Sequence, residues 1–126
     1  MRIIYIAGLL LLAVSGMAFQ CSKPVEEGTV YTGKLEIKAI CMNYTLTVVS
    51  GNIDTSKVEG SWTDPTTNTS YENAFALANP CSFPDSIQAG QEFKFVITSP
   101  AAEQCAVCLA YYPVPSKKLH IRVVNQ

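Results

Sequence analysis

The chain has 126 residues, the length of one small domain once an apolar leader is set aside. Its composition, 48% apolar and 15% charged residues, excludes a disordered chain, and its formal net charge of −1 excludes the basic surface of a nucleic-acid binder. The only histidine is His120, so most metal and hydrolase sites that need several histidines are excluded as well.

The first 20 residues are predicted to be a signal peptide. A basic residue, Arg2, precedes an apolar run over residues 3–14, which is shorter than the roughly 20 residues that a helix needs to span a bilayer. Small residues follow, so ordinary cleavage after Ala18 is one interpretation. The other is lipoprotein processing at Cys21, because the residues before it resemble a lipobox, with Gln20 in place of the usual small residue.

Lipidation of Cys21 is the interpretation that we favour, because it leaves four cysteines, an even number that suits disulfides in an oxidising compartment. Residues 21–28 then form a polar tether, and residues 29–126 form the folded domain. The predicted location is the cell envelope, as an outer-membrane lipoprotein that faces the periplasm or the cell surface. The membrane is the expected partner, since an anchor with more than one acyl chain binds stably.

Alternation of apolar and polar residues predicts short strands along the folded domain. The apolar positions change from odd to even numbers before Tyr44, so a turn or a β-bulge is expected near residues 41–43. Asp54 and Gly60 are the expected start and end of one short helix or helical turn. The predicted strands cover residues 34–39, 44–48, 74–78, 93–97, 106–112 and 119–123.

Five or six short strands with one helical interruption predict an all-β domain, a small closed or partly open barrel. The order of elements resembles that of an oligonucleotide/oligosaccharide-binding (OB) barrel, and a β-sandwich is the alternative. Residues 106–112 are apolar at every position, as in a strand that is covered on both faces. Residues 61–70 are polar and rich in turn-forming residues, so no strand is predicted there.

Cys41, Cys81, Cys105 and Cys108 allow three disulfide pairings. A bridge between the first two would close a loop of about 41 residues, worth roughly 4 kcal/mol, whereas a bridge between the last two would close about four residues, worth roughly 2 kcal/mol. Because strand positions i and i+3 point to opposite faces, a single strand over residues 105–112 would favour the cross-pairings with Cys41 and Cys81. Two structural disulfides are expected, with the pairing open.

A metal or thiol carrier that uses Cys105 and Cys108 is a functional alternative. A redox motif needs a cation or a helix N-terminus beside the thiolate, and no basic residue follows these cysteines before Lys117. A four-cysteine zinc site usually has two CxxC pairs where this chain has one, and copper(I) is as good a match for thiolates. No metal ion and no cofactor are predicted.

No catalytic residue is predicted. His120 is expected to be a solvated residue on the polar face of the last strand. Asn52, Asp54 and Ser56 have the spacing of calcium ligands, but the glycine and the terminal glutamate of a calcium loop are at the wrong offsets.

Trp62, the only tryptophan, lies in the polar stretch, with Tyr71 following it. Aromatic residues on loops beside a rigid barrel often bind ligands. A tryptophan that plugs one end of the barrel is the other interpretation. The candidate ligand-binding residues are Trp62, Asp64, Tyr71, Tyr111 and Tyr112.

Four segments, residues 40–44 (ICMNY), 61–65 (SWTDP), 79–84 (NPCSFP) and 105–113 (CAVCLAYYP), carry a resemblance to a known group of proteins. Together they resemble small exported lipoproteins of Bacteroidota with an OB-like β-barrel domain. The likeness covers most of residues 29–124, and it implies export without implying an activity.

The predicted function is a non-catalytic binding module of the cell envelope for a glycan, a peptide or an envelope protein. A periplasmic inhibitor or assembly factor that acts through protein contacts alone is the alternative, and the metal or thiol carrier is the third. OB-like barrels bind ligands along one sheet face and its flanking loops, so fold analogy alone places the site there.

Overall fold

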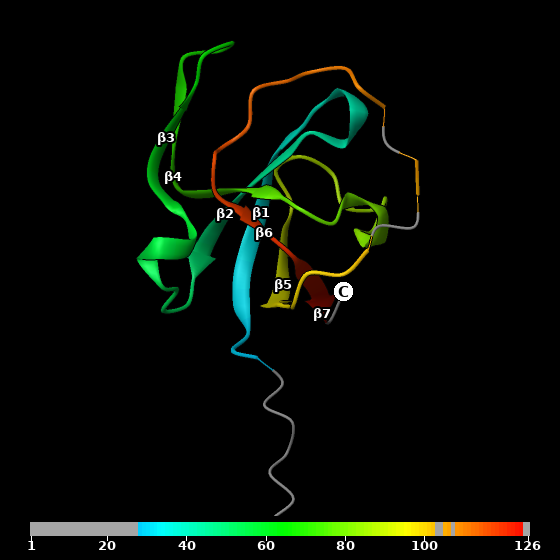
Figure 1. Cartoon of the computed structure of the whole chain (residues 1–126). Coiled ribbons are helices and arrows are strands. Elements are labelled where there is room, and N and C mark those ends of the chain that lie inside the picture. The colour runs from blue at the N-terminus through cyan, green and yellow to red at the C-terminus, as the bar shows by residue number, and fades with distance from the viewer. Residues whose placement is uncertain (1–27, 103–104, 107, 125–126) are drawn as a thin grey trace, which may run out of the picture.

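The computed structural model describes residues 28–102, 105–106 and 108–124 (Figure 1). The predicted signal peptide and Cys21 lie outside the described residues. Strands and short 3-10 turns are the regular elements of the described residues, and no helix among them is long and apolar enough to cross a bilayer. The elements are β1 (Tyr31–Lys38), η1 (Ile40–Met42), β2 (Tyr44–Ser50), η2 (Thr55–Lys57), β3 (Glu59–Asp64), β4 (Thr69–Leu77), η3 (Pro80–Ser82), β5 (Glu92–Ile97), β6 (Lys118–Leu119) and β7 (Ile121–Val124).

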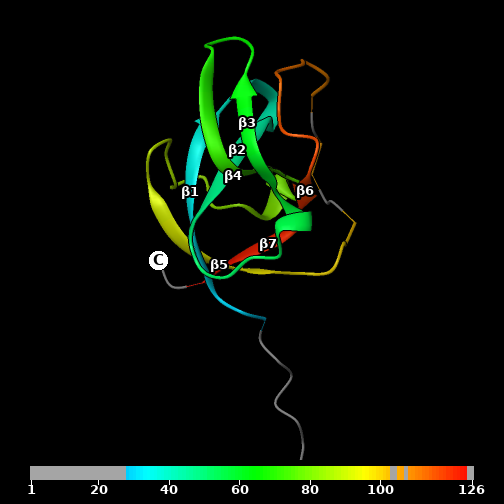
Figure 2. The same cartoon turned by 90° about the vertical axis from the view of Figure 1, so that its left-hand side faces the viewer.

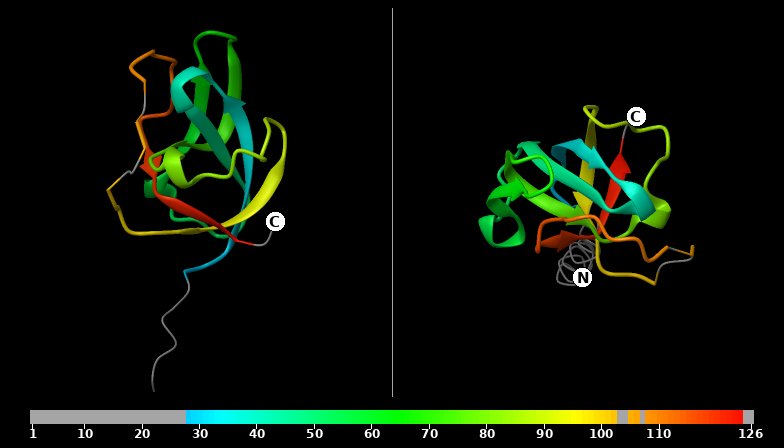
Figure 3. Two further views of the ribbon diagram at one scale, coloured as in Figure 1. Left: turned by 90° about the vertical axis from the view of Figure 1, so that its right-hand side faces the viewer. Right: turned by 90° about the horizontal axis from the view of Figure 1, so that it is seen from above.

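The seven strands form one curled sheet in the order β3-β4-β2-β1-β5-β7. Neighbours along this path are antiparallel, whereas β6 runs parallel to β4. Only His120 separates β6 from β7, so the C-terminal segment pairs with β4 at one end and with β5 at the other. Figure 3 shows the resulting curl, which is that of a partly open barrel, and the predicted all-β fold is confirmed.

The turn expected near residues 41–43 is present as η1. In η1 the backbone of Cys41 and Met42 is left-handed, with φ of 57° and 58°. A register shift between Leu35 and Ile37 adds an irregularity to β1. Leu35 still pairs with Leu46 of β2, and both side chains are fully buried. The change in apolar numbering therefore keeps the apolar faces of both strands in one core.

The hydrophobic core lies inside the curl of the sheet. Phe95 packs against Phe75 and Phe93, with ring centroids 5.8 and 5.9 Å apart. A Cβ added to Gly33 would lie 2.8 Å from the Phe95 ring, so β1 requires glycine at this close approach. The other buried core residues are Leu35, Tyr44, Leu46, Val48, Ile53, Val58, Leu77, Phe83, Ile87, Leu119 and Ile121.

Strands β3 and β4 form a long hairpin, where the sequence predicted only a short strand at 74–78. The two strands pair in one register from Glu59 opposite Ala74 to Asp64 opposite Thr69. Figure 2 shows the hairpin in front of the rest of the sheet. Because most of its side chains between these pairs are exposed or half-buried, the hairpin has no apolar alternation for sequence analysis to detect.

No strand forms in the described part of residues 106–112, so that prediction is wrong. Residues 105–106 and 108–117, called the cysteine loop below, are drawn in orange at the top of Figure 1. Leu109 and Tyr111 are 99% and 83% exposed. The described residues of this run are apolar but largely exposed. Disulfides and side-chain hydrogen bonds hold the segment on the domain, and it makes no β-ladder.

The predicted helix between Asp54 and Gly60 is reduced to the single 3-10 turn η2. Asp54 caps this turn as expected, since its Oδ1 accepts a 2.9 Å hydrogen bond from the Ser56 N–H. The turn ends early because β3 begins at Glu59. The side chain of Glu59 accepts a 2.8 Å hydrogen bond from the N–H of Ser116 in the cysteine loop.

Candidate functional site

Two disulfides connect the cysteine loop to the barrel. Cys108 is bonded to Cys41 in η1, and Cys105 is bonded to Cys81 in η3, with Cα–Cα distances of 5.2 and 5.6 Å. These distances lie in the usual bridging range. Two structural disulfides are therefore confirmed, in one of the two cross-pairings, and each end of the CxxC segment is held by a different 3-10 turn.

Side-chain hydrogen bonds fix the same loop at two further points. The Asn43 amide donates to the carbonyl oxygens of Ile40 and Ala110, both at 2.9 Å. The Ser116 hydroxyl bonds to Glu59, as its N–H also does. The cysteine loop is therefore attached to η1 at one end and to the start of β3 at the other.

Asp64, at the end of β3, is fully buried and accepts hydrogen bonds at both carboxylate oxygens. Its Oδ1 accepts from the Thr66 N–H, and its Oδ2 accepts from the Tyr112 hydroxyl, both at 2.8 Å. Burial by itself raises the pKa of Asp64, but the bonds from Thr66, Tyr112 and Thr67 outweigh it and lower the pKa. The hydrogen bond from the Tyr112 hydroxyl to Asp64 in turn raises the pKa of Tyr112. The ionised form of Asp64 therefore holds the cysteine loop against the hairpin.

Trp62 and Tyr71 are directly opposite each other in β3 and β4, and their rings stack. The ring centroids are 6.1 Å apart, with an angle of 24° between the planes, and both side chains are half-buried. Burial raises the pKa of Tyr71, and the negative charges of Glu36 and Asp64 raise it further. Trp62, Asp64, Tyr71 and Tyr112 are called the aromatic–acid cluster below.

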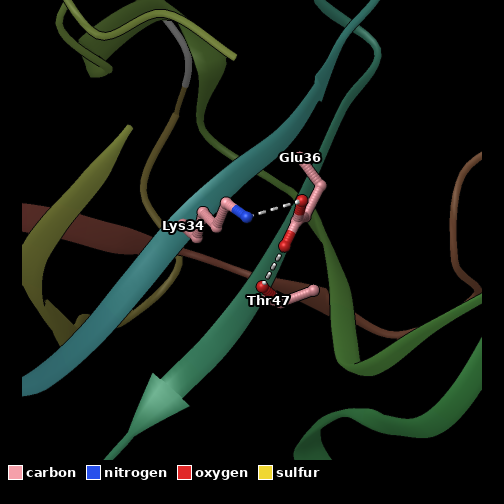
Figure 4. A network of polar contacts seen from close by, with 3 residues as sticks. All are labelled: Lys34, Glu36 and Thr47. Carbon is pink, nitrogen blue, oxygen red and sulfur yellow. Dashed lines mark hydrogen bonds and ion pairs between the residues drawn. The ribbon is translucent and has the colours of Figure 1, made fainter. Parts of the chain in front are cut away.

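Glu36 of β1 adds a second carboxylate near this cluster, and the sequence did not single it out as a site residue. Its Oε1 accepts a 3.0 Å hydrogen bond from the Thr47 hydroxyl, and its Oε2 lies 3.6 Å from the Lys34 ammonium (Figure 4). In the sequence, Glu36 is one of several charges that alternate with apolar residues. Nothing in that pattern distinguishes the charge that lies near Tyr71.

The structure brings together four of the five predicted ligand-binding residues. Trp62 lies outside the core cluster, so it does not plug the barrel. The fifth residue, Tyr111, is largely exposed on the cysteine loop and makes no side-chain hydrogen bond or ring contact among the described residues. What connects the four is the hydrogen bond between Tyr112 and Asp64, which no sequence pattern specifies.

The remaining candidate residues have other surroundings. His120 is half-buried between β6 and β7 and lines two pockets. Asp54 of the calcium-like pattern caps η2. Within the residues that the structure describes, no three side chains of His, Cys, Asp or Glu are grouped as metal ligands would be.

No protein-family model matches this chain, and neither the comparison with curated proteins nor that with solved structures gives a match.

Proposed function

We propose that this protein is a non-catalytic, lipid-anchored binding module of the cell envelope that captures a glycan through the aromatic–acid cluster. The observation that carries the proposal is the stacked pair of Trp62 and Tyr71, half-exposed on the hairpin and outside the core. Sugar rings present flat C–H faces that pack on aromatic rings, and aromatic residues with a polar atom suit a site that is partly wet.

Polar groups beside the pair supply what sugar hydroxyls require. Glu36 is half-buried next to Tyr71 and has a carboxylate that accepts hydrogen bonds. Asp64 already accepts protein donors at both oxygens, so it acts as a positioning residue that holds Tyr112 beside the aromatic pair. The Tyr112 ring then forms one side of the site, and a preformed site spends less free energy on ordering when the ligand binds.

The position of the cluster suits a protein that is tethered by its N-terminus. The described chain begins with the blue segment that leads into β1, at the lower end of the molecule in Figure 1, and the turn between β3 and β4 lies at the upper end. A lipid on Cys21, with residues 21–28 as tether, would present the cluster away from the membrane. Two disulfides also suit an oxidising compartment.

The test is a glycan array probed with wild-type protein, Trp62→Leu and Trp62→Phe. Leucine keeps an apolar side chain but removes the aromatic plane, whereas phenylalanine keeps a plane. Retention of the ligand is expected to fall about tenfold or more for Trp62→Leu, the loss of one strong contact, and to be largely kept by Trp62→Phe. Equal retention by both variants would contradict the proposal.

A second function, protein capture by an inhibitor or assembly factor, is favoured by a different observation. Ile40, Leu109 and Tyr111 are 63%, 99% and 83% exposed, and the first two flank the Cys41–Cys108 bridge. Exposed apolar side chains that lie together often mark protein contacts. Pull-down from envelope extract with Leu109→Ser beside wild type separates the two functions, because this change leaves the aromatic–acid cluster intact.

The metal or thiol carrier stays a prediction, and the two disulfides add a requirement to it. Metal ligands and redox nucleophiles are thiolates, so Cys105 and Cys108 would first have to be released from Cys81 and Cys41 by reduction.

A further inference from the structure

A pocket of about 470 Å³ lies beside the Cys41–Cys108 disulfide, and none of the four cluster residues lines it. Its walls come from η1, the end of β4, η3 and β6. This volume is within the roughly 300–1,000 Å³ of small-molecule sites. Because the disulfide joins η1 to the cysteine loop, two of the surrounding segments are fixed relative to each other in the absence of a ligand.

One part of the lining is apolar. Met42, Leu77 and Pro80 line it, together with the bonded residues Cys41 and Cys108. Met42 is half-buried and packs against the hydrophobic core, so this wall is continuous with the interior of the barrel. Such a surface favours the hydrocarbon part of a ligand.

The other part of the lining is basic. Lys118 and His120 are two residues apart on the C-terminal segment and both line the pocket. No aspartate or glutamate among the described residues lines it, and the one ion pair found in the described ranges is between Lys34 and Glu36. The Lys118 ammonium is exposed and has no carboxylate partner there. The pocket therefore carries a positive charge that an anionic ligand would neutralise.

We infer that this pocket binds a small monocarboxylic acid with an apolar body, with its carboxylate at Lys118 and His120 and its hydrocarbon part against Met42, Leu77 and Pro80. A charge-assisted hydrogen bond from the ammonium sets the orientation, and burial of the apolar body contributes most of the affinity. The inference does not depend on glycan binding, because the two sites share no residue.

Octanoate is a suitable probe, and binding is followed by NMR amide shifts of the oxidised protein. Saturable shifts are expected at Met42, Leu77, Ala78 and His120, which line the pocket. Octylammonium has the same chain with the opposite charge, and acetate has the carboxylate without the chain. Both are expected to bind at least about tenfold more weakly than octanoate, since each lacks one of the two interactions.

Lys118→Gln and Lys117→Gln form a matched pair, because they remove the same charge from adjacent residues and only Lys118 lines the pocket. Octanoate affinity is expected to fall about tenfold in Lys118→Gln, as for the loss of one hydrogen bond to a charged group, and to be unchanged in Lys117→Gln. Three results would overturn the inference: no saturable shifts with octanoate, equal binding of octylammonium, or equal losses in the two lysine variants.

Discussion

The Tyr112 hydroxyl donates a 2.8 Å hydrogen bond to Oδ2 of Asp64, a carboxylate that is fully buried. The two residues are 48 positions apart in the chain. This bond attaches the cysteine loop to the far end of the β3–β4 hairpin, beside the stacked rings of Trp62 and Tyr71. It therefore determines whether the aromatic–acid cluster exists as one site.

Tyr112→Phe is expected to lower the free energy of unfolding at neutral pH, because it leaves a buried carboxylate oxygen without its donor. The pKa of Asp64 is lowered, so its stabilising contribution is present above the ordinary value of 3.8 and is lost as pH falls through the lower folded value. The pKa of Tyr112 is raised, so its contribution is present below 10.0 and is lost as pH rises through the higher folded value.

Chemical denaturation of wild type and Tyr112→Phe across pH checks this prediction. The difference between their free energies of unfolding is expected to be largest between pH 3.8 and pH 10.0 and to shrink on both sides. A difference that is absent at pH 7 would show that the hydrogen bond does not stabilise the native state.

Thr45→Val is expected to raise the free energy of unfolding by about 1 kcal/mol. Among the described residues, the Thr45 hydroxyl is the one buried side-chain polar group without a hydrogen-bond partner. Thr47→Val is the matched control, since Thr47 is 5% exposed on the same strand but donates to Glu36. That change is expected to lower the free energy of unfolding by about 1 kcal/mol. Urea denaturation measures both, and a loss in both variants would contradict the assignment.

Removing the disulfides one at a time is expected to destabilise the protein by different amounts. The bridges Cys41–Cys108 and Cys81–Cys105 join residues 67 and 24 positions apart. Double alanine variants are expected to lose roughly 4.4 and roughly 3.5 kcal/mol, respectively, in the chain-entropy model. Denaturation without reductant measures the losses. The control is the intact mass of the wild-type protein before and after reduction. A gain of fewer than four hydrogens would mean that at least one of the two bridges is absent.

Trp62→Ala is expected to lower the free energy of unfolding by only about 1 kcal/mol, the size of one cross-strand aromatic pair, while it weakens ligand capture. Phe75→Ala, which removes a fully buried core ring, is expected to cost about 3–5 kcal/mol. Thermal or urea unfolding of both variants measures the contrast. A loss for Trp62→Ala as large as that for Phe75→Ala would make Trp62 a residue of the core.

Strand β5 could be predicted from the sequence because its two faces meet different surroundings. In β5, Phe93 and Phe95 are buried whereas Glu92 and Lys94 are exposed, so the alternation is a direct record of burial. Most side chains of the hairpin of β3 and β4 before Ala74 are exposed or half-buried, so this part of the chain shows no alternation of apolar and polar residues. For residues 106–112 a covered strand was predicted, and none forms in the described part. An apolar composition does not reveal that disulfides hold a segment at the surface.

The candidate site was predicted as a set of residues and not as an arrangement. Trp62 was selected for its unusual polar surroundings, and Asp64, Tyr71 and Tyr112 for their residue types. The contact among these residues depends on the register of the hairpin and on the disulfide pairing. The sequence alone determined neither of them. Glu36 was missed because its position near Tyr71 depends on the pairing of β1 with β2 and of β2 with β4.

The most direct measurement of the central claim is the fluorescence of Trp62, the only tryptophan in the chain. Its emission reports on the aromatic–acid cluster without any label. On titration with each oligosaccharide that an array retains, we expect a saturable change in emission, with a midpoint equal to that of retention. Retention of a glycan with no change in Trp62 emission, or an array that retains no glycan, would contradict the account.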